Sequence, residues 1–242
     1  MVNQTEMNKY FLREDLFIKN GIFYFDKGNE EFEEVTKSNF FEAFSLYGWE
    51  EIDYLWETQL NKYFLLLDCG SNGDCLFHCV SEALNLQKIY KGKNEDEDDF
   101  KDVNDLRIIA SNEINDDNFN IILETYKLED ELGEFQGYWD PVDILTKEDL
   151  QCEIRKNGNN FWGDHIIIQL LSKALNINFI ILNSDDDTDT ISFTHVNTNN
   201  KNYNIIIYYE NKCHYKLVGK FDGKKMQVLF KTIPKYIIEL NK

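Results

Sequence analysis

The sequence lacks the features that place a protein in or across a membrane. No apolar run approaches the ~20 consecutive residues that a membrane-spanning helix needs. Residues 1–12 are polar, without the apolar segment of a secretory signal. We therefore expect no membrane association and a cytoplasmic location.

Cysteines are few, and their spacing is not paired. Five occur, an odd number, which suits a reducing compartment better than a disulfide framework. Cys69, Cys75 and Cys79 lie close together in the sequence but lack the C-x2-C pairs of a structural zinc site. We therefore expect no bound metal.

Basic residues are also scarce. The chain has 25 Lys and Arg against 44 Asp and Glu, so its formal net charge is −19. This charge argues against binding to nucleic-acid backbones or anionic membranes, and it is compatible with a basic protein partner. Two acidic runs, 94–99 and 185–189, are most simply solvated loops.

The chain does contain enough apolar residues to fold. Of its 242 residues 43% are hydrophobic, including 18 Phe, so wholesale disorder is excluded. The length fits one large domain, or one domain with an added segment. We expect residues 1–60 to form an N-terminal extension that packs on a core of residues 61–235.

The order of the predicted elements indicates an α+β fold. Asn20-Gly21 predicts a hairpin turn between two short apolar runs. Helical spacing then dominates until about residue 175, and apolar or β-rich runs follow. This order predicts a small, mainly antiparallel sheet flanked by helices. The predicted helices are 40–46, 49–60, 75–85, 103–114, 119–132 and 167–175, and the late strands are 177–182, 203–209, 213–218 and 226–230.

The stretch 68–85 is the most informative in the chain. A turn cluster, 70–74, separates a short apolar run from a helix whose first turn contains Cys75. The free amides and the dipole at the start of a helix favour a thiolate, the reactive form of cysteine. The loop amides of Asn72, Gly73, Asp74 and Cys75 are placed to stabilise an oxyanion beside the sulfur. The alternative is a small buried cysteine without chemistry.

A nucleophilic cysteine needs a base, and the chain has four histidines. His78 lies one turn after Cys75 and points along the same helix. His165 begins a helix, where packing or capping explains it, and His195 lies in a polar stretch. His214 begins a strand after a tight turn, where a side chain is held rigidly at a sheet edge. We therefore prefer His214 as the base.

These features together resemble one known family. Residues 72–78 read Asn-Gly-Asp-Cys-Leu-Phe-His, similar to the nucleophile motif of the ovarian-tumour (OTU) family of cysteine proteases. The resemblance covers about residues 60–220, and its ending is similar to OTU proteins of large DNA viruses, which would place the protein in the host-cell cytoplasm. The further signals in order are Leu106-Arg107 with the helix after it, Trp162-Gly163 with an apolar helix, the run 177–182, and His214-Tyr215.

The resemblance implies a fold and an activity. The fold would be that of a papain-type cysteine protease, with residues 61–235 as an OTU-like catalytic domain. The family hydrolyses the isopeptide bond after the C-terminal Gly-Gly of ubiquitin. Cys75 would attack the glycyl carbonyl and form a thioester, and His214 would act as general base and then general acid. The partner would be ubiquitin or polyubiquitin chains, with no metal or cofactor, and we expect a monomer.

One departure from the family pattern concerns the group that orients the histidine. Many members carry Asp three residues before the nucleophile, where this chain has Asn72. Others carry Asp or Asn two residues after the histidine, where this chain has Lys216, which cannot accept a hydrogen bond. We expect Asn72 to orient His214 through its amide oxygen, with Asp68 and Asp74 as alternatives.

Three competing interpretations remain open. The first is a catalytically weakened protein of the same fold that binds ubiquitin as a scaffold, which the departure at Asn72 suggests. The second is a protease for another ubiquitin-like modifier. The third is an unrelated acidic interaction protein, against which four ordered signals argue.

Overall fold

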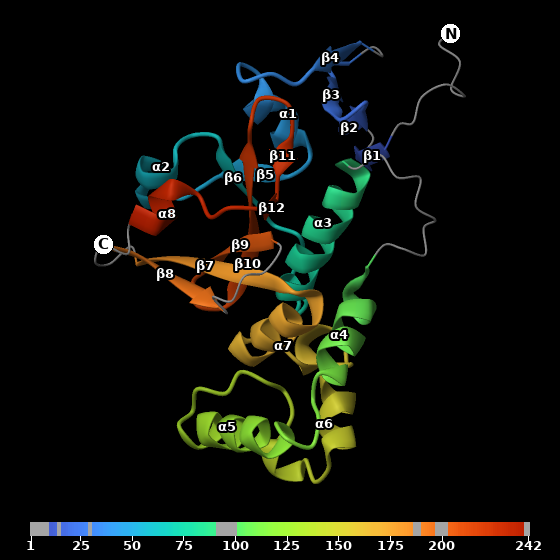
Figure 1. The fold of residues 1–242 in the computed structure, drawn as a ribbon, viewed down its shortest axis with the longest axis vertical. Helices are drawn as coiled ribbons and strands as arrows, with labels where there is room; N and C mark the ends of the chain where they lie inside the picture. The colour runs from blue at the N-terminus through green and yellow to red at the C-terminus, as the bar shows by residue number, and fades with distance from the viewer. Residues whose placement is uncertain are drawn as a thin grey trace.

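The computed structural model describes residues 10–13, 16–28, 31–90, 101–185, 190–196 and 203–239. The acidic run 94–99 and most of the run 185–189 lie outside these ranges. Figure 1 shows a central sheet, a smaller sheet above it and a group of helices below it. In the described part of the chain, no helix is long and apolar enough to span a bilayer.

The central sheet has eight strands and is mainly antiparallel. The path of neighbouring strands is β5-β6-β10-β9-β7-β8, with β11 beside β10 and β12 beside β9, and β7 and β9 run parallel. The predicted α+β class is thereby confirmed. The strands are β5 (Trp49–Glu51), β6 (Phe64–Leu67), β7 (Ile177–Asp185), β8 (Thr190–Val196), β9 (Tyr203–Glu210), β10 (His214–Phe221), β11 (Met226–Gln227) and β12 (Leu229–Phe230).

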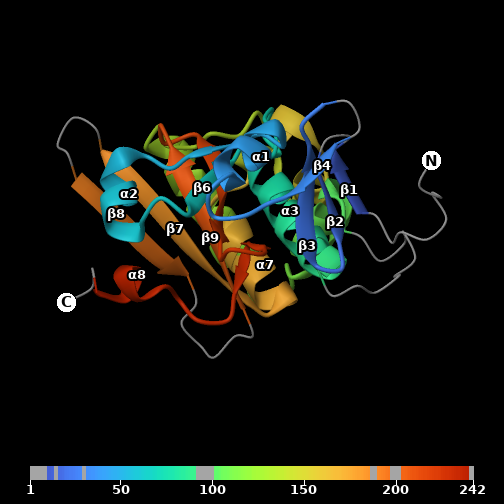
Figure 2. The same ribbon diagram turned by 90° about the horizontal axis from the view of Figure 1, so that it is seen from above.

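Helices cover both faces of this sheet, because the strand residues that point to each face are apolar. Leu65 and Leu67 of β6 belong to the larger core, while Phe64 and Leu66 belong to a second cluster on the opposite face. The views in Figures 1 and 2 place α2 and α8 on the side of the second cluster, away from α3. The helices are α1 (Phe40–Leu46), α2 (Tyr54–Leu60), α3 (Cys75–Tyr90), α4 (Val103–Asn112), α5 (Phe119–Glu131), α6 (Lys147–Ile154), α7 (His165–Leu175) and α8 (Lys235–Glu239), with short 3-10 turns η3 (Pro141–Asp143) and η4 (Gly158–Asn160).

The N-terminal segment forms a four-stranded antiparallel sheet and also enters the central sheet. Asn20 and Gly21 have φ of 52° and 74°, as a tight hairpin between β2 and β3 requires. Leu16, Ile18, Phe23 and Phe25 of this sheet belong to the same core cluster as α3. β5, which also lies within residues 1–60, pairs with β6. The small sheet consists of β1 (Tyr10–Arg13), β2 (Leu16–Lys19), β3 (Ile22–Asp26) and β4 (Phe32–Glu34).

One predicted helix differs from the structure, and several elements, among them β8, α6 and α8, were not predicted. The predicted helix 49–60 is wrong in its first turn, because residues 49–51 form β5 and α2 begins only at Tyr54. Asp53 marks this start, since its carboxylate accepts a hydrogen bond from the Leu55 amide (2.8 Å). β8 escaped prediction because it is an edge strand whose side chains are exposed or half-buried, so it lacks an apolar run.

Candidate active site

The loop between β6 and α3 has a backbone shape that few residues tolerate. Asn72 has φ of 62° and Gly73 has φ of 87°, in the left-handed region that Asn tolerates and Gly adopts freely. A Cβ on Gly73 would lie only 2.3 Å from the carbonyl oxygen of Gly158. The sequence Asn72-Gly73 therefore fits both this turn and its close contact with the loop at Gly158.

Cys75 is the first residue of α3 and is buried. It shares a cavity of about 290 Å³ with His214. Burial raises the pKa of the Cys75 thiol, while the backbone N–H groups of Tyr215 and Leu76 lower it. Because burial is the largest of these effects, a neighbouring base is needed to make the thiolate.

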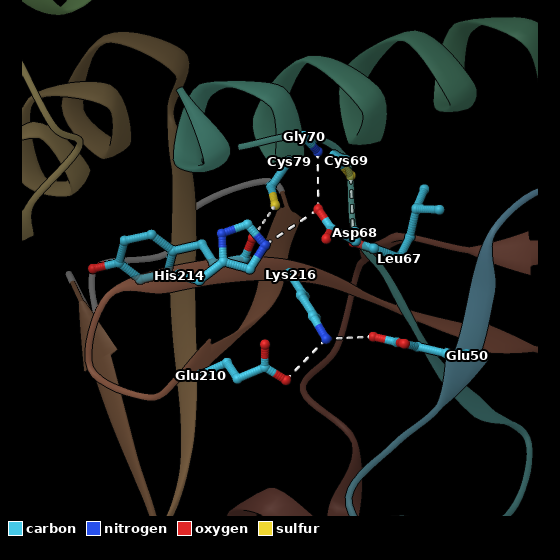
Figure 3. Close-up of polar contacts among 10 residues, drawn as sticks. Glu50, Leu67, Asp68, Cys69, Gly70, Cys79, Glu210, His214 and Lys216 are labelled. Carbon is cyan, nitrogen blue, oxygen red and sulfur yellow. Dashed lines mark hydrogen bonds and ion pairs between the residues drawn. The ribbon is translucent and has the colours of Figure 1, made fainter. Parts of the chain in front are cut away.

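His214 begins β10 and contacts Asp68, the residue that follows β6. The two strands pair antiparallel, with Leu217 opposite Leu67, so the start of β10 and the end of β6 lie at the same end of the sheet. The distance from His214 Nε2 to Asp68 Oδ1 is 3.2 Å. Figure 3 shows the imidazole directed at this carboxylate. With Nε2–H donating to Asp68, Nδ1 is the ring nitrogen that can accept a proton.

Asp68 is also fixed by its own loop. Its Oδ1 accepts a hydrogen bond from the Gly70 amide (3.1 Å), which holds the carboxylate beside the turn. About half of its side chain is exposed (51%), against 20% for His214. Water therefore weakens the ion pair that forms when His214 is protonated.

The structure places Asn72 in the cavity and Asp74 outside it. Asn72 lines the cavity beside Cys75, but the side chain at hydrogen-bonding distance of His214 is that of Asp68. The Asp74 carboxylate is paired with the Arg107 guanidinium at 2.5 Å. The Asp74 amide donates to the Ser71 carbonyl (3.4 Å), so it is already engaged among the four predicted oxyanion donors.

Lys216 occupies the position where some family members carry an acid. Its ammonium lies 2.5 Å from Glu50 Oε1 and 2.8 Å from Glu210 Oε1, with only 11% of the side chain exposed. In Figure 3 this side chain points away from the His214 ring, between the two glutamates. Lys216 thus joins β10 to β5 and to the end of β9, and it supports the strand that carries His214.

The other three histidines lie elsewhere. The His78 ring packs on Gly70, where an added Cβ would lie 2.8 Å from His78 Cδ2. His165 begins α7, and His195 lies on the edge strand β8, where burial lowers its pKa. Among the histidines, which all fall in the described ranges, His214 lines the cavity with Cys75.

A second cavity of about 300 Å³ adjoins the first, and five residues line both. Trp139 and Phe161 stack on one of its sides, with ring centroids 5.5 Å apart. Glu129, Glu134 and Asp164 give it an acidic lining. The residues shared by the two cavities are Gln136, Trp162, Gly163, Tyr209 and Tyr215.

Sequence reasoning missed the function of Arg107, which is wholly buried and holds Asp74. A signal existed, because Arg107 lies beside Leu106 on the apolar face of a predicted helix, where a charge needs a buried partner. The loop at Gly158 gave no such signal, since its sequence is that of an ordinary polar turn. No cluster of three or more metal-ligating side chains occurs within the described ranges.

Comparison with known proteins identifies the family. A family model described as OTU-like cysteine protease matches residues 70–217, which include Cys75 and His214. The chain therefore belongs to the OTU-like cysteine protease family. No curated protein sequence matches the chain.

Solved structures of OTU proteins are similar at low sequence identity. The OTUD1 OTU domain is 15% identical, with 69% of this chain and 93% of that one covered and a TM-score of 0.44. An OTU deubiquitinase from Wolbachia pipientis wMel bound to ubiquitin is 13% identical (67% and 99% covered, TM-score 0.43). The viral OTU protease from Dera Ghazi Khan virus is 16% identical (69% and 83%, TM-score 0.38).

Proposed function

We propose that the chain is a deubiquitinase in which Cys75 is the nucleophile and His214 the general base. The observation that carries this proposal is the cavity shared by Cys75 and His214, with Asp68 bonded to Nε2 of the imidazole. A nucleophile, a base and an orienting group in this order are the parts that acyl transfer by cysteine requires. Membership of the OTU-like cysteine protease family supports the same chemistry.

The reaction follows from these positions. His214 Nδ1 takes the thiol proton, and Cys75 Sγ attacks the carbonyl carbon of the last glycine. The carbonyl electron pair moves onto oxygen, where amides of Gly73 and Cys75 stabilise it. The C–N bond then breaks, the lysine amine leaves with the proton from His214, and a thioester remains. Water, deprotonated by His214, hydrolyses the thioester and releases ubiquitin with a free carboxylate.

We propose Asp68, in place of Asn72, as the group that orients His214. The 3.2 Å contact with Nε2 fixes the tautomer that leaves Nδ1 free for the thiol proton. It also stabilises the imidazolium that forms during the reaction. Asn72 contributes its backbone conformation to the oxyanion loop, which explains why a residue that tolerates positive φ stands there.

The adjoining cavity suits the extended C-terminal tail of the modifier. Trp162 and Gly163 line both cavities, so a tail in the second cavity leads directly to Cys75. Gly163 packs on Leu76 of α3, where an added Cβ would lie 2.7 Å from the Leu76 side chain. The acidic lining complements the basic tail of ubiquitin.

A ubiquitin-binding protein with weakened catalysis is the second candidate. The raised pKa of the buried Cys75 thiol favours it, because less of the sulfur is thiolate at neutral pH. Cleavage of a ubiquitin C-terminal fluorogenic amide separates the two candidates. We expect turnover that Cys75→Ala and His214→Ala abolish, whereas a scaffold protein would bind ubiquitin without turnover. A protein that cleaves only the amide of another ubiquitin-like modifier would redirect the proposal to that modifier.

A further inference from the structure

α3, the helix that carries Cys75, begins differently from the other helical segments that follow an aspartate. In those four segments the preceding aspartate caps its own first turn. Asp74 holds the same position before α3, but none of the described hydrogen bonds joins its carboxylate to an amide of that helix. The capping contacts are Asp53 to Leu55 N (2.8 Å), Asp102 to Asp105 N (2.8 Å), Asp140 to Val142 N (2.8 Å) and Asp164 to Ile167 N (2.9 Å).

The Asp74 carboxylate is instead hydrogen-bonded to Arg107 and to the loop at Gly158. Its Oδ1 accepts hydrogen bonds from Arg107 Nε (2.9 Å) and Nη2 (2.5 Å). Its Oδ2 accepts one from the Gly158 amide (2.8 Å). Both oxygens are therefore directed away from the start of α3.

Arg107 is itself held on all sides. Its side chain has no exposed surface, and the guanidinium carbon lies 4.2 Å from the centre of the Phe77 ring. Nη1 donates to the Ile154 carbonyl and Nη2 to the Phe161 carbonyl, each at 2.8 Å. Arg107 thus connects α4 to both ends of the segment 154–161. Asp74, in the loop between β6 and α3, joins this network.

The direction of the Asp74 carboxylate decides what the first amides of α3 can do. The first helical bond runs from His78 N–H to the Asp74 carbonyl (2.9 Å), so the amides of Cys75, Leu76 and Phe77 lack partners inside the helix. A capping aspartate would occupy the Leu76 or Phe77 amide. It would also place a negative charge beside the sulfur, which opposes the thiolate.

We propose that Arg107 is a positioning residue for the reaction: it holds the Asp74 carboxylate away from α3, so that the first amides of α3 serve the Cys75 thiolate and the oxyanion. This inference rests on the proposed function of Cys75 as nucleophile. By the same contacts, Arg107 fixes the segment whose Asn159 lines the cavity.

The test compares Arg107→Met, Asp74→Asn and the double variant, with Arg155→Met as the matched control. Arg155 lies within the same segment 154–161 and also bonds α4, through Ser111 and Asn112, but none of its described hydrogen bonds goes to Asp74. The rate at which iodoacetamide modifies Cys75 is followed by peptide mass between about pH 6 and pH 11, a range that extends well above an ordinary cysteine pKa because burial raises the pKa of Cys75. The kcat and KM for a ubiquitin C-terminal fluorogenic amide are measured alongside.

Arg107→Met frees the Asp74 carboxylate. We therefore expect the pH profile of Cys75 modification in this variant to move to higher pH by about one unit, which makes the reaction about tenfold slower at neutral pH. In the double variant the charge is gone, and we expect the profile to return to that of the wild type. Arg155→Met is expected to match the wild type throughout. The kcat should fall in Arg107→Met with little change in KM.

A folded Arg107→Met variant with an unchanged profile would overturn the proposal, as would a double variant as slow as the single one. If Arg107→Met does not fold, Arg107→Lys replaces it, for which we expect a smaller upward shift that Asp74→Asn again reverses. Cys75 modification needs no ubiquitin, so it tests Arg107 independently. The proposed function fails separately, if ubiquitin cleavage survives Cys75→Ala.

Discussion

The contact between His214 and Asp68 makes a quantitative prediction. We expect Asp68→Ala to lower kcat about tenfold with little change in KM. Loss of a hydrogen bond to a charged group costs about 1.5–3 kcal/mol. Because half of the Asp68 side chain is in water, the lower end of this range applies, and about 1.4 kcal/mol corresponds to a factor of ten.

Two further variants separate the contributions of Asp68. Asp68→Ala also removes the acceptor for the Gly70 amide. Asp68→Asn keeps an oxygen that can accept from both Gly70 and His214, so we expect it to lose only about threefold, less than half the free energy of the alanine variant. The thermal unfolding temperature of each variant shows whether the substitution has destabilised the loop between β6 and α3.

Asn72→Gly is the matched comparison. Glycine removes the amide side chain and still adopts the φ of 62° that Asn72 has in the loop. If Asp68 orients His214, we expect Asn72→Gly to keep kcat within about threefold of the wild type, below the cost of a charged hydrogen bond. Turnover of a ubiquitin C-terminal fluorogenic amide measures both constants. A tenfold loss in Asn72→Gly with full activity in Asp68→Ala would refute the assignment.

The remaining predictions concern the support of the site and the binding of substrate. Gly73→Ala should lower turnover about a hundredfold or more, because a Cβ would lie 2.3 Å from Gly158 O and displace the loop. Gly28 is also at positive φ, but a Cβ there would have no atom within 4 Å, so Gly28→Ala should leave turnover unchanged. Lys216→Met should lower the free energy of unfolding, measured in urea, by about 1–2 kcal/mol, because Glu50 and Glu210 lose their common partner. An effect no larger than that of Lys127→Met, a half-buried lysine on α5 that is paired with the exposed Glu124, would contradict this. Leu128 and Leu132 are exposed at the end of α5 and lie in the sequence on either side of Glu129, which lines the acidic cavity. We expect the modifier to contact this end of α5, so that Leu128→Asp and Leu132→Asp raise KM about fivefold or more at constant kcat. Equal effects from Tyr236→Asp on α8 would show that the change is not local.

The elements that define the fold could be read from the sequence where periodicity is strong. The predicted helix 167–175 and the run 177–182 correspond to α7 and to the first part of β7, because their apolar residues fill buried positions. β8 is easily missed, because its apolar residues Ile191 and Phe193 alternate with polar ones and are only half-buried, so the strand has no continuous apolar run. β5 was hidden because Trp49 is its only buried residue and the two glutamates after it are exposed.

The candidate site could be predicted only in part, for a physical reason. Cys75 and His214 each stand at the start of a regular element, where a local pattern marks them. The residue beside His214 depends on which strands become neighbours, and the pairing of β6 with β10 brings Asp68 there from 146 positions away. The expectation for Asn72 rests on its place three residues before Cys75, where many family members carry Asp, and that place does not fix the direction of its side chain; Asp68, the alternative, is the residue that contacts His214.

We propose that Cys75 attacks the C-terminus of ubiquitin with the help of His214. The most direct test is reaction of the purified protein with ubiquitin that carries a C-terminal electrophile, followed by intact mass. We expect a single adduct in the wild type, none in Cys75→Ala and much slower formation in His214→Ala. An adduct that persists in Cys75→Ala, or a folded wild type that forms none, would contradict the account.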